Sequence, residues 1–162
     1  MATVLSENDM FFTAFQPKQS HLFVMYMDGI PSYMLKAASR PTLNQPEKTI
    51  PYINLERYIK GKSVWQPMQV TLQDPIVPSG AQAVMEWIRL GHESVTGRDG
   101  YSDFYKKSII LNLLGPVGDR VEEWILNGAF ITSTNFGKMD YSSDEITNIE
   151  LTLRYDYAVL NY

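Results

Sequence analysis

Few residues of this 162-residue chain have the type and spacing that metal binding or nucleophilic catalysis requires. The two histidines, His21 and His92, stand far apart, and His92-Glu93 lacks the second histidine that a zinc-binding helix needs. The chain contains no cysteine, which excludes disulfides and any cysteine-built zinc or iron–sulfur site. We therefore expect no metal site and two ordinary histidines.

The carboxylates and glycines also fail to form a recognisable site. Glu122 and Glu123 are adjacent, and successive side chains of a strand point to opposite faces, so the two carboxylates cannot act on one atom. We expect both to be solvated charges. No Gly-x-Ser-x-Gly motif is present, and Gly115 and Gly118 are typical of a turn between strands rather than of a phosphate-binding loop. The sequence therefore predicts no enzymatic activity, no cofactor and no small-molecule substrate.

The composition favours a single domain that does not hold nucleic acid tightly. With 44% hydrophobic residues, a chain of this length forms one core, which buries roughly 70% of the surface that the unfolded chain exposes. A net charge of −4 and the lack of any basic run argue against a surface that grips phosphates. Neither a transmembrane span nor a secretory signal is expected.

Large apolar side chains are more numerous than one small core needs. The chain has ten Tyr, seven Phe, three Trp and eight Met, and such residues are enriched in protein interfaces. Residues 1–20 are expected to form an aromatic N-terminal arm ahead of a single β domain at 21–162. The arm either packs on its own domain or contacts a neighbouring subunit, and Trp87 either wedges under a loop or faces a partner. The candidates for subunit interfaces are Met10, Phe11, Phe12, Phe15 and Trp87.

The clearest structural element is the last one, because every odd position from Ile149 to Val159 is apolar. This period-two pattern predicts one long β-strand with a buried face and a solvated face. The polar face carries Glu150, Thr152, Arg154 and Asp156.

Similar patterns predict further strands near 21–28, 64–73 and 105–114. Asp28-Gly29 is expected to close a hairpin between the run 21–28 and the segment that follows it. Asn127-Gly128 is the preferred dipeptide of a two-residue type I′ turn, so the segments 120–126 and 129–133 are expected to pair as a hairpin.

The remaining segments are expected to be a long loop and one helix. Three prolines predict that Arg40–Glu56 is a loop with at most short strand pieces. A helix is predicted from its N-cap at Ser79 to about residue 96. These elements together favour a mainly β protein, an antiparallel sandwich or barrel with one flanking α-helix.

Three local patterns resemble those of the tail tube proteins of contractile-tailed, T4-like bacteriophages. They are the strand entry Tyr105-Lys106-Lys107-Ser108, the bend at Thr134-Asn135 before Asp140-Tyr141, and the closing Leu-Thr-Leu-x-Tyr-Asp-Tyr run that ends at Tyr157. The resemblance is clearest over Gln69–Tyr157. It is weaker at the N-terminus, where the aromatic arm and the proline-rich loop depart from the family pattern.

This resemblance implies a structural virion protein that assembles into stacked hexameric rings. The strands of six subunits would close one inner β-barrel, the conduit for DNA delivery and the core of a contractile sheath. The implied partners are further copies of the chain, the tail sheath, a tape-measure protein in the lumen, baseplate and tail-terminator proteins, and DNA in transient passage. The implied location is the virion tail, after assembly in the host cytoplasm. Glu150, Thr152, Arg154 and Asp156 would face the lumen or contact the ring.

Two alternatives to the tube subunit stay open. Within the same class, the chain could be a tube initiator near the baseplate or the tube protein of a related injection system. From a different class, it could be a monomeric β-barrel that binds a small ligand in an aromatic cavity.

Overall fold

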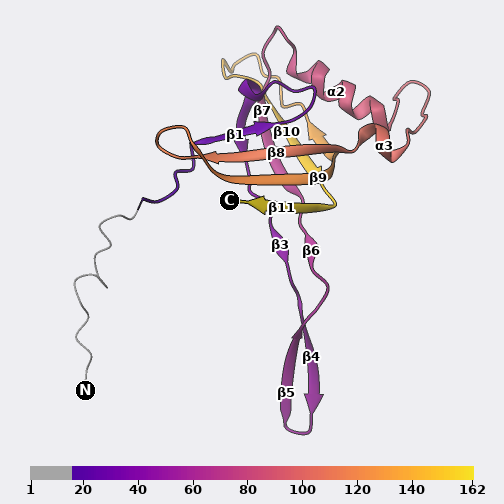
Figure 1. The fold of residues 1–162 in the computed structure, drawn as a ribbon. Helices are drawn as coiled ribbons and strands as arrows, with labels where there is room; N and C mark the ends of the chain where they lie inside the picture. Colours follow the sequence, from indigo (N-terminus) through magenta and orange to yellow (C-terminus); the bar gives the residue numbers. More distant parts are fainter. Residues whose placement is uncertain (1–15) are drawn as a thin grey trace.

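The computed structural model describes residues 16–162, and Figure 1 shows their fold. The aromatic residues Met10, Phe11, Phe12 and Phe15 lie outside the described residues. The strands are β1 (Phe23–Tyr26), β2 (Leu35–Ala38), β3 (Leu43–Asn44), β4 (Glu47–Tyr52), β5 (Leu55–Lys60), β6 (Val64–Trp65), β7 (Met68–Gln73), β8 (Lys107–Leu114), β9 (Arg120–Asn135), β10 (Asn148–Arg154) and β11 (Tyr157–Asn161). The helices are the 3₁₀ turn η1 (Ser32–Met34), α2 (Gly80–Gly91) and the single turn α3 (Ser102–Tyr105).

The main sheet has seven antiparallel strands and folds into two halves that share β9. Its order is β1-β8-β9-β10-β7-β2, with β11 also paired to β9. The first part of β9 pairs with β8 and β11, and its last part, from Phe130 to Asn135, pairs with β10. Figure 1 shows the two halves crossing, with β8 and β11 running across the view and β7 and β10 running down it. The predicted fold class, mainly antiparallel β with one flanking helix, is confirmed.

The hydrophobic core lies between the two halves and α2. Alternate residues of β7 and β10 point into it, among them Leu72 and Leu151, which are completely buried. Ile109 of β8 and Met25 of β1 meet them from the other half. Burying each such side chain stabilises the folded protein by roughly 1.5–3 kcal/mol relative to leaving it exposed. The alternation therefore determines which face of each strand packs on the core and which face points away from it.

The predicted long final strand is interrupted, which corrects the expectation of one continuous element. β10 ends at Arg154 and β11 begins at Tyr157. Tyr155 is still buried, whereas Tyr157 is exposed. Between them the amide of Asp156 donates a hydrogen bond to the carbonyl oxygen of Asn127 at 2.9 Å. The break lets the chain follow β9 from one half of the sheet to the other.

The hairpin predicted at Asn127-Gly128 is wrong, because both residues lie inside the continuous strand β9. The segments on either side of them pair with other strands instead of with each other. Gly128 does adopt a positive φ of 68°. The left-handed conformation that the dipeptide favours is used here to bend a strand between two half-sheets rather than to reverse the chain.

The turn at Asp28-Gly29 is present, but the hairpin expected from it is not. Gly29 has a φ of 83°, and the amide of Ile30 donates to the carbonyl oxygen of Met27 at 3.2 Å. The two strands that flank the turn then separate, since β1 pairs with β8 and β2 pairs with β7. A turn motif specifies a local reversal and does not choose the strand partners.

The segment predicted as a loop, Arg40–Glu56, instead forms most of a long β-ribbon. β3 pairs with β6, and β4 pairs with β5, so that the chain from Leu43 to Trp65 projects from the body as a two-stranded arm (Figure 1). Both strands of such a ribbon are edge strands, where proline is tolerated. We call residues 43–65 the β4–β5 arm.

The helix prediction is correct at its start and too long at its end. The Ser79 hydroxyl accepts a hydrogen bond from the amide of Gln82 at 3.4 Å, as an N-cap should. The helix stops at Gly91, after which His92 forms an isolated β-bridge with Asp99. No helix among the described residues is long and apolar enough to span a membrane.

Candidate assembly interfaces

One face of the half-sheet formed by β2, β7, β10 and the end of β9 is polar and points away from the core. On β10, Glu150, Thr152 and Arg154 alternate with buried residues. The register places Glu150 between Thr71 and Asn135, and the Thr152 hydroxyl lies 3.2 Å from the side-chain oxygen of Gln69. The polar side chains therefore form a continuous surface across three strands, and none of them is buried within the chain.

Asp156 lies at the end of that face rather than in it. It occupies the break between β10 and β11, and its carboxylate accepts two hydrogen bonds from the Lys106 ammonium, each at 3.0 Å. Glu150, Thr152, Arg154 and Asp156 remain lumen or ring-contact candidates, three of them together on one strand and the fourth beside Gly128.

The same half-sheet has two open edges, one at each side. Among residues 16–162, β2 pairs only with β7, and Phe130–Asn135 of β9 pairs only with β10, because the pairings of β8 end at Ala129. Adjacent strands alternate in direction, so β2 and this part of β9 run oppositely. A second copy related by rotation can therefore place its β2 antiparallel to the open edge of β9.

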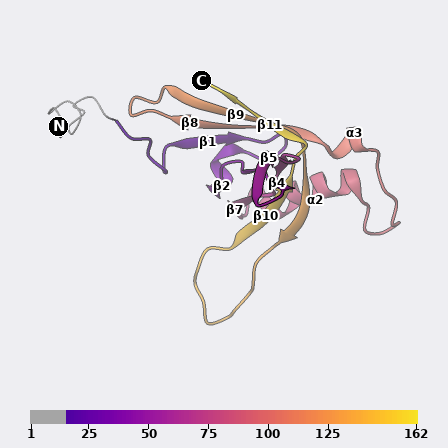
Figure 2. The same ribbon diagram turned by 90° about the horizontal axis from the view of Figure 1, so that it is seen from below.

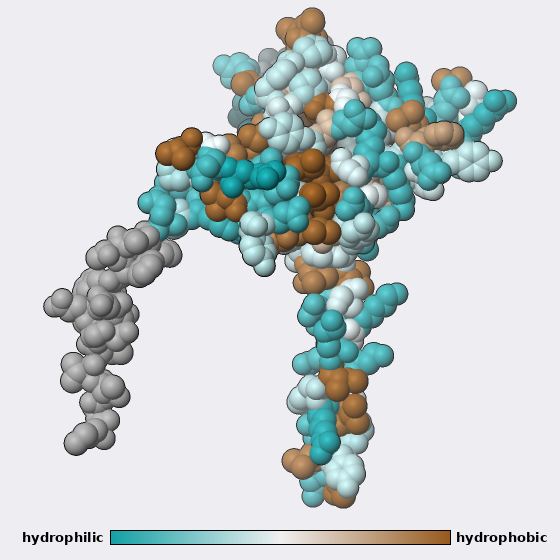
Figure 3. All heavy atoms as spheres, in the orientation of Figure 1, coloured by the Kyte–Doolittle hydropathy of each residue, from teal (hydrophilic) through white to brown (hydrophobic). Residues whose placement is uncertain are grey.

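The β4–β5 arm exposes large apolar side chains along its length. All twelve residues of its two outer strands are exposed. Figure 3 shows brown, hydrophobic residues interspersed with hydrophilic ones down to its tip. The exposed apolar side chains of the arm are Ile50, Tyr52, Ile53, Leu55, Tyr58 and Ile59. An isolated two-stranded ribbon is marginally stable in water, so a surface of this kind indicates a partner.

A buried carboxylate ties the base of the arm and the start of the described chain to β9. Glu122 is 5% exposed, which corrects the expectation of a solvated charge. Lys18 and the Trp124 indole N–H both donate to its carboxylate, and Arg40 lies 3.7 Å away. Burial by itself raises the pKa of Glu122, but the hydrogen bonds and the two cations outweigh it and hold the pKa below its ordinary value of 4.5.

This arrangement predicts a pH-dependent contribution to stability. Because the folded pKa of Glu122 is lowered, its contribution is present above pH 4.5 and is lost as the pH falls through the folded pKa. In urea unfolding between pH 7 and pH 3, Glu122→Gln should show a shallower acid loss of unfolding free energy than the wild type. Glu123→Gln, which removes the next carboxylate along β9, is the matched control for the loss of one negative charge. Equal slopes for all three proteins would contradict the assignment.

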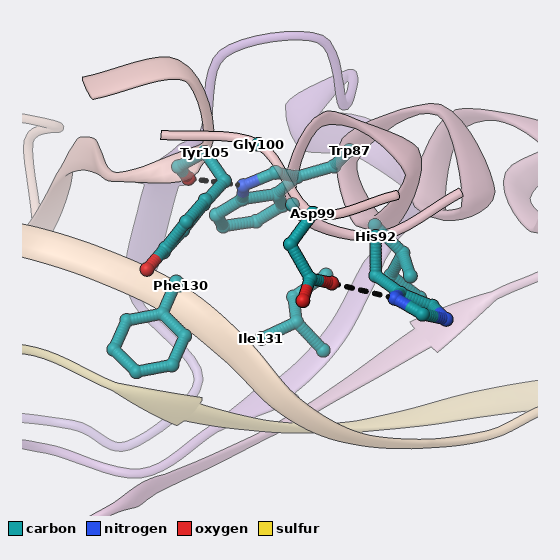
Figure 4. Close-up of a pocket in the computed structure, with 9 residues that line it drawn as sticks. Trp87, His92, Asp99, Gly100, Tyr105, Phe130 and Ile131 are labelled. Carbon is teal, nitrogen blue, oxygen red and sulfur yellow. Dashed lines mark hydrogen bonds and ion pairs between the residues drawn. The ribbon is translucent and has the colours of Figure 1, made fainter. Parts of the chain in front are cut away.

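A hollow of about 370 Å³ lies between α2, α3 and the end of β9, as Figure 4 shows. Trp87 is 3% exposed and its indole N–H donates to the carbonyl oxygen of Tyr105 at 2.8 Å. Of the two alternatives for Trp87, the structure shows the wedge beneath a neighbouring segment and not a surface contact. The buried face of the helix contains Gly80, Val84 and Trp87.

The rim of this hollow carries a histidine–aspartate pair without the groups that would make it catalytic. His92 Nδ1 lies 2.7 Å from Asp99 Oδ1, and both side chains are more than half exposed. The described residues that line the hollow include no serine, cysteine or lysine that the pair could activate. The described part of the chain also holds no cluster of His, Asp and Glu that could bind a metal ion.

Comparison with known proteins gives a fold likeness without a sequence family. No protein-family model matches the chain, and no curated protein sequence matches it. A chain of the cryo-EM structure of the anti-feeding prophage cap, a tube terminating cap, is similar with a TM-score of 0.72 and 20% identity over 97% of this chain and 99% of that one.

Two chains from an extracellular contractile injection system are also similar. One comes from the sheath/tube terminator of PVC in its extended state, with a TM-score of 0.70 and 20% identity over 93% of this chain and 100% of that one. The other comes from the PVC sheath–tube complex, with a TM-score of 0.65 and 21% identity over 98% of this chain and 99% of that one. The chain therefore has the fold of tube-type proteins of contractile systems. These neighbours belong to structural assemblies rather than enzymes, which agrees with the prediction from sequence.

Proposed function

We propose that this protein is a ring-forming subunit of the hollow tube of a contractile tail or injection machine. The observation that carries the proposal is the pair of open, oppositely directed edges on the half-sheet whose free face is polar. Pairing β2 of one copy with β9 of the next satisfies both edges and generates a closed ring if the rotation closes.

In such a ring the polar face lines the channel. The core and α2 occupy the other side of the half-sheet, so Glu150, Thr152 and Arg154 point to the lumen and Asp156 lies near the contact between subunits. A hexamer is the expected ring. Because Glu150 and Arg154 have opposite charges, the channel surface would be close to neutral, which lets a passing chain move without strong adhesion.

The fold likeness supports a tube in general and does not distinguish among contractile machines. Within this proposal the partners are other copies of the chain, a surrounding sheath, and initiator and terminator proteins at the two tube ends. A bacteriophage tail tube that holds a tape-measure protein and delivers DNA is the specific role that the local sequence patterns favour. Because two of the similar chains come from cap and terminator complexes, a subunit at the tube end is the second candidate.

The test is negative-stain electron microscopy of the purified full-length protein together with its mass by light scattering. Hollow rings or tubes with six-fold end views are expected. A monodisperse monomer at high concentration, which also fails to join tubes when mixed with pre-formed tube ends, would contradict the proposal and favour the monomeric ligand-binding barrel.

A further inference from the structure

The hollow between α2, α3 and β9, which we call the aromatic hollow, adjoins the open edge of β9. Phe130 and Ile131 are the first residues of that edge, and both line the hollow. The rings of Tyr105 and Phe130 meet edge to face there, with centroids 5.6 Å apart. Five large side chains that are apolar or aromatic contribute to the lining: Trp87, Ile88, Tyr105, Phe130 and Ile131. Such a lining is suited to an aromatic side chain from another segment.

The start of the described chain lies beside the other open edge, that of β2. Residues 18–20 line a smaller hollow together with Ala38, the last residue of β2, and Arg40. The ion pair of Lys18 with Glu122 holds the chain at this place. Figure 2 shows the indigo start of the described chain at one side of the subunit and α2 and α3 at the other, and Figure 1 agrees. The chain therefore enters the body beside β2, on the side away from its own aromatic hollow.

The proposed pairing of β2 with β9 brings these two places together across the contact between copies. Because β2 and β9 run oppositely, the end of β2 and the start of the open β9 segment lie at the same end of the half-sheet. Paired strands are only about 5 Å apart, whereas five residues of extended chain span up to about 18 Å. The residues just before the described chain are therefore long enough to cross the strand contact to a neighbouring copy.

We propose that the run Met10-Phe11-Phe12 of one copy inserts into the aromatic hollow of the neighbouring copy in the ring. The inference rests on the proposed function and assigns a binding site to this run. The donor lies at the β2 side of each subunit and the acceptor at its β9 side, so the contact is head-to-tail and repeats around the ring. Burial of aromatic side chains then stabilises the ring in addition to strand pairing.

Phe11→Ser with Phe12→Ser in the full-length protein tests the donor. The variant should stay folded by circular dichroism and should need about tenfold more protein or beyond for half-maximal ring formation, because aromatic anchors dominate such interfaces. Val4→Ser with Leu5→Ser is the matched control, since it removes two apolar side chains of the same segment outside the proposed contact. The control should form rings like the wild type. Unchanged ring formation by the phenylalanine variant, or loss of its fold, would overturn the inference.

Because the chain contains no cysteine, cross-linking between introduced thiols can test the proximity directly. Phe12→Cys with Ile88→Cys places one thiol in the donor and one in the acceptor of each copy. Treating assembled rings with a short bismaleimide should give a ladder of covalent multimers on denaturing gels. Phe12→Cys with Ile76→Cys is the control and should give no ladder, since Ile76 is exposed just before the other end of α2.

Mixing copies that carry only Phe12→Cys with copies that carry only Ile88→Cys should give covalent dimers. A link formed only within one chain would show that the run binds its own copy and would overturn the inference. Rings of the wild type together with no cross-link between copies would also overturn it, while leaving the ring-forming function intact. Failure of the wild type to form rings would instead contradict the proposed function, and this inference with it.

Discussion

Gly128→Val is expected to destabilise the protein by about 3 kcal/mol, because a β-branched residue must take up a left-handed backbone and a blocked position at once. Gly128 has a φ of 68°, and a Cβ built there would lie 2.1 Å from Asp156 Oδ2 and 2.7 Å from its Cγ. To make room, the Asp156 side chain must turn aside and leave its ion pair with Lys106. Urea unfolding monitored by circular dichroism measures the loss.

Gly118→Val is the matched control for this prediction. Gly118 has a φ of 84° in the turn between β8 and β9, but a Cβ there would meet no atom within 4 Å. The Gly118→Val variant should therefore lose only the free energy that valine costs in a left-handed backbone conformation. It should be less destabilised than Gly128→Val. Adding Asp156→Ala to Gly128→Val should recover part of the difference. Equal destabilisation of the Gly118 and Gly128 variants would show that the contact with Asp156 has no energetic role.

The elements that sequence predicted well are those whose signal is burial along a single strand. The alternation around Leu72 and Leu151 identified the buried faces correctly because one side of each strand faces one core. The same alternation could not reveal the break after Arg154, since Tyr157 continues the pattern while facing solvent on another half-sheet. A period-two pattern indicates on which face of the sheet a residue lies, but it does not indicate which strand its own strand pairs with.

The errors at turns and prolines have a common origin in non-local pairing. Asn127-Gly128 has the local conformational preference of a turn. It instead forms a bend within β9, because the segments around it pair with β8, β10 and β11. In the arm, Pro51 suggested a loop because a single sequence does not show that both strands of the ribbon are edges. The open edges of β2 and β9, on which the proposed function depends, are likewise a property of the assembled sheet.

Ala38→Pro should abolish ring formation while leaving a folded monomer. The amide of Ser39 donates to the carbonyl oxygen of Gln69 at 3.0 Å, so by the alternation along a strand the amide of Ala38 points away from β7, to the open edge. Proline is tolerated in an edge strand at such a position, because no hydrogen bond to β7 is lost. The missing N–H and the added ring would, however, obstruct the addition of another strand.

Ala38→Ser keeps the outward-pointing amide and should form rings like the wild type. This control separates the effect of losing the backbone N–H from the effect of changing the side chain at position 38. Circular dichroism and urea unfolding establish that the proline variant is folded, and light scattering with electron microscopy establishes its assembly state. Intact rings from a folded Ala38→Pro protein would show that β2 is not a ring contact. A folded monomer would place the ring contact at this edge.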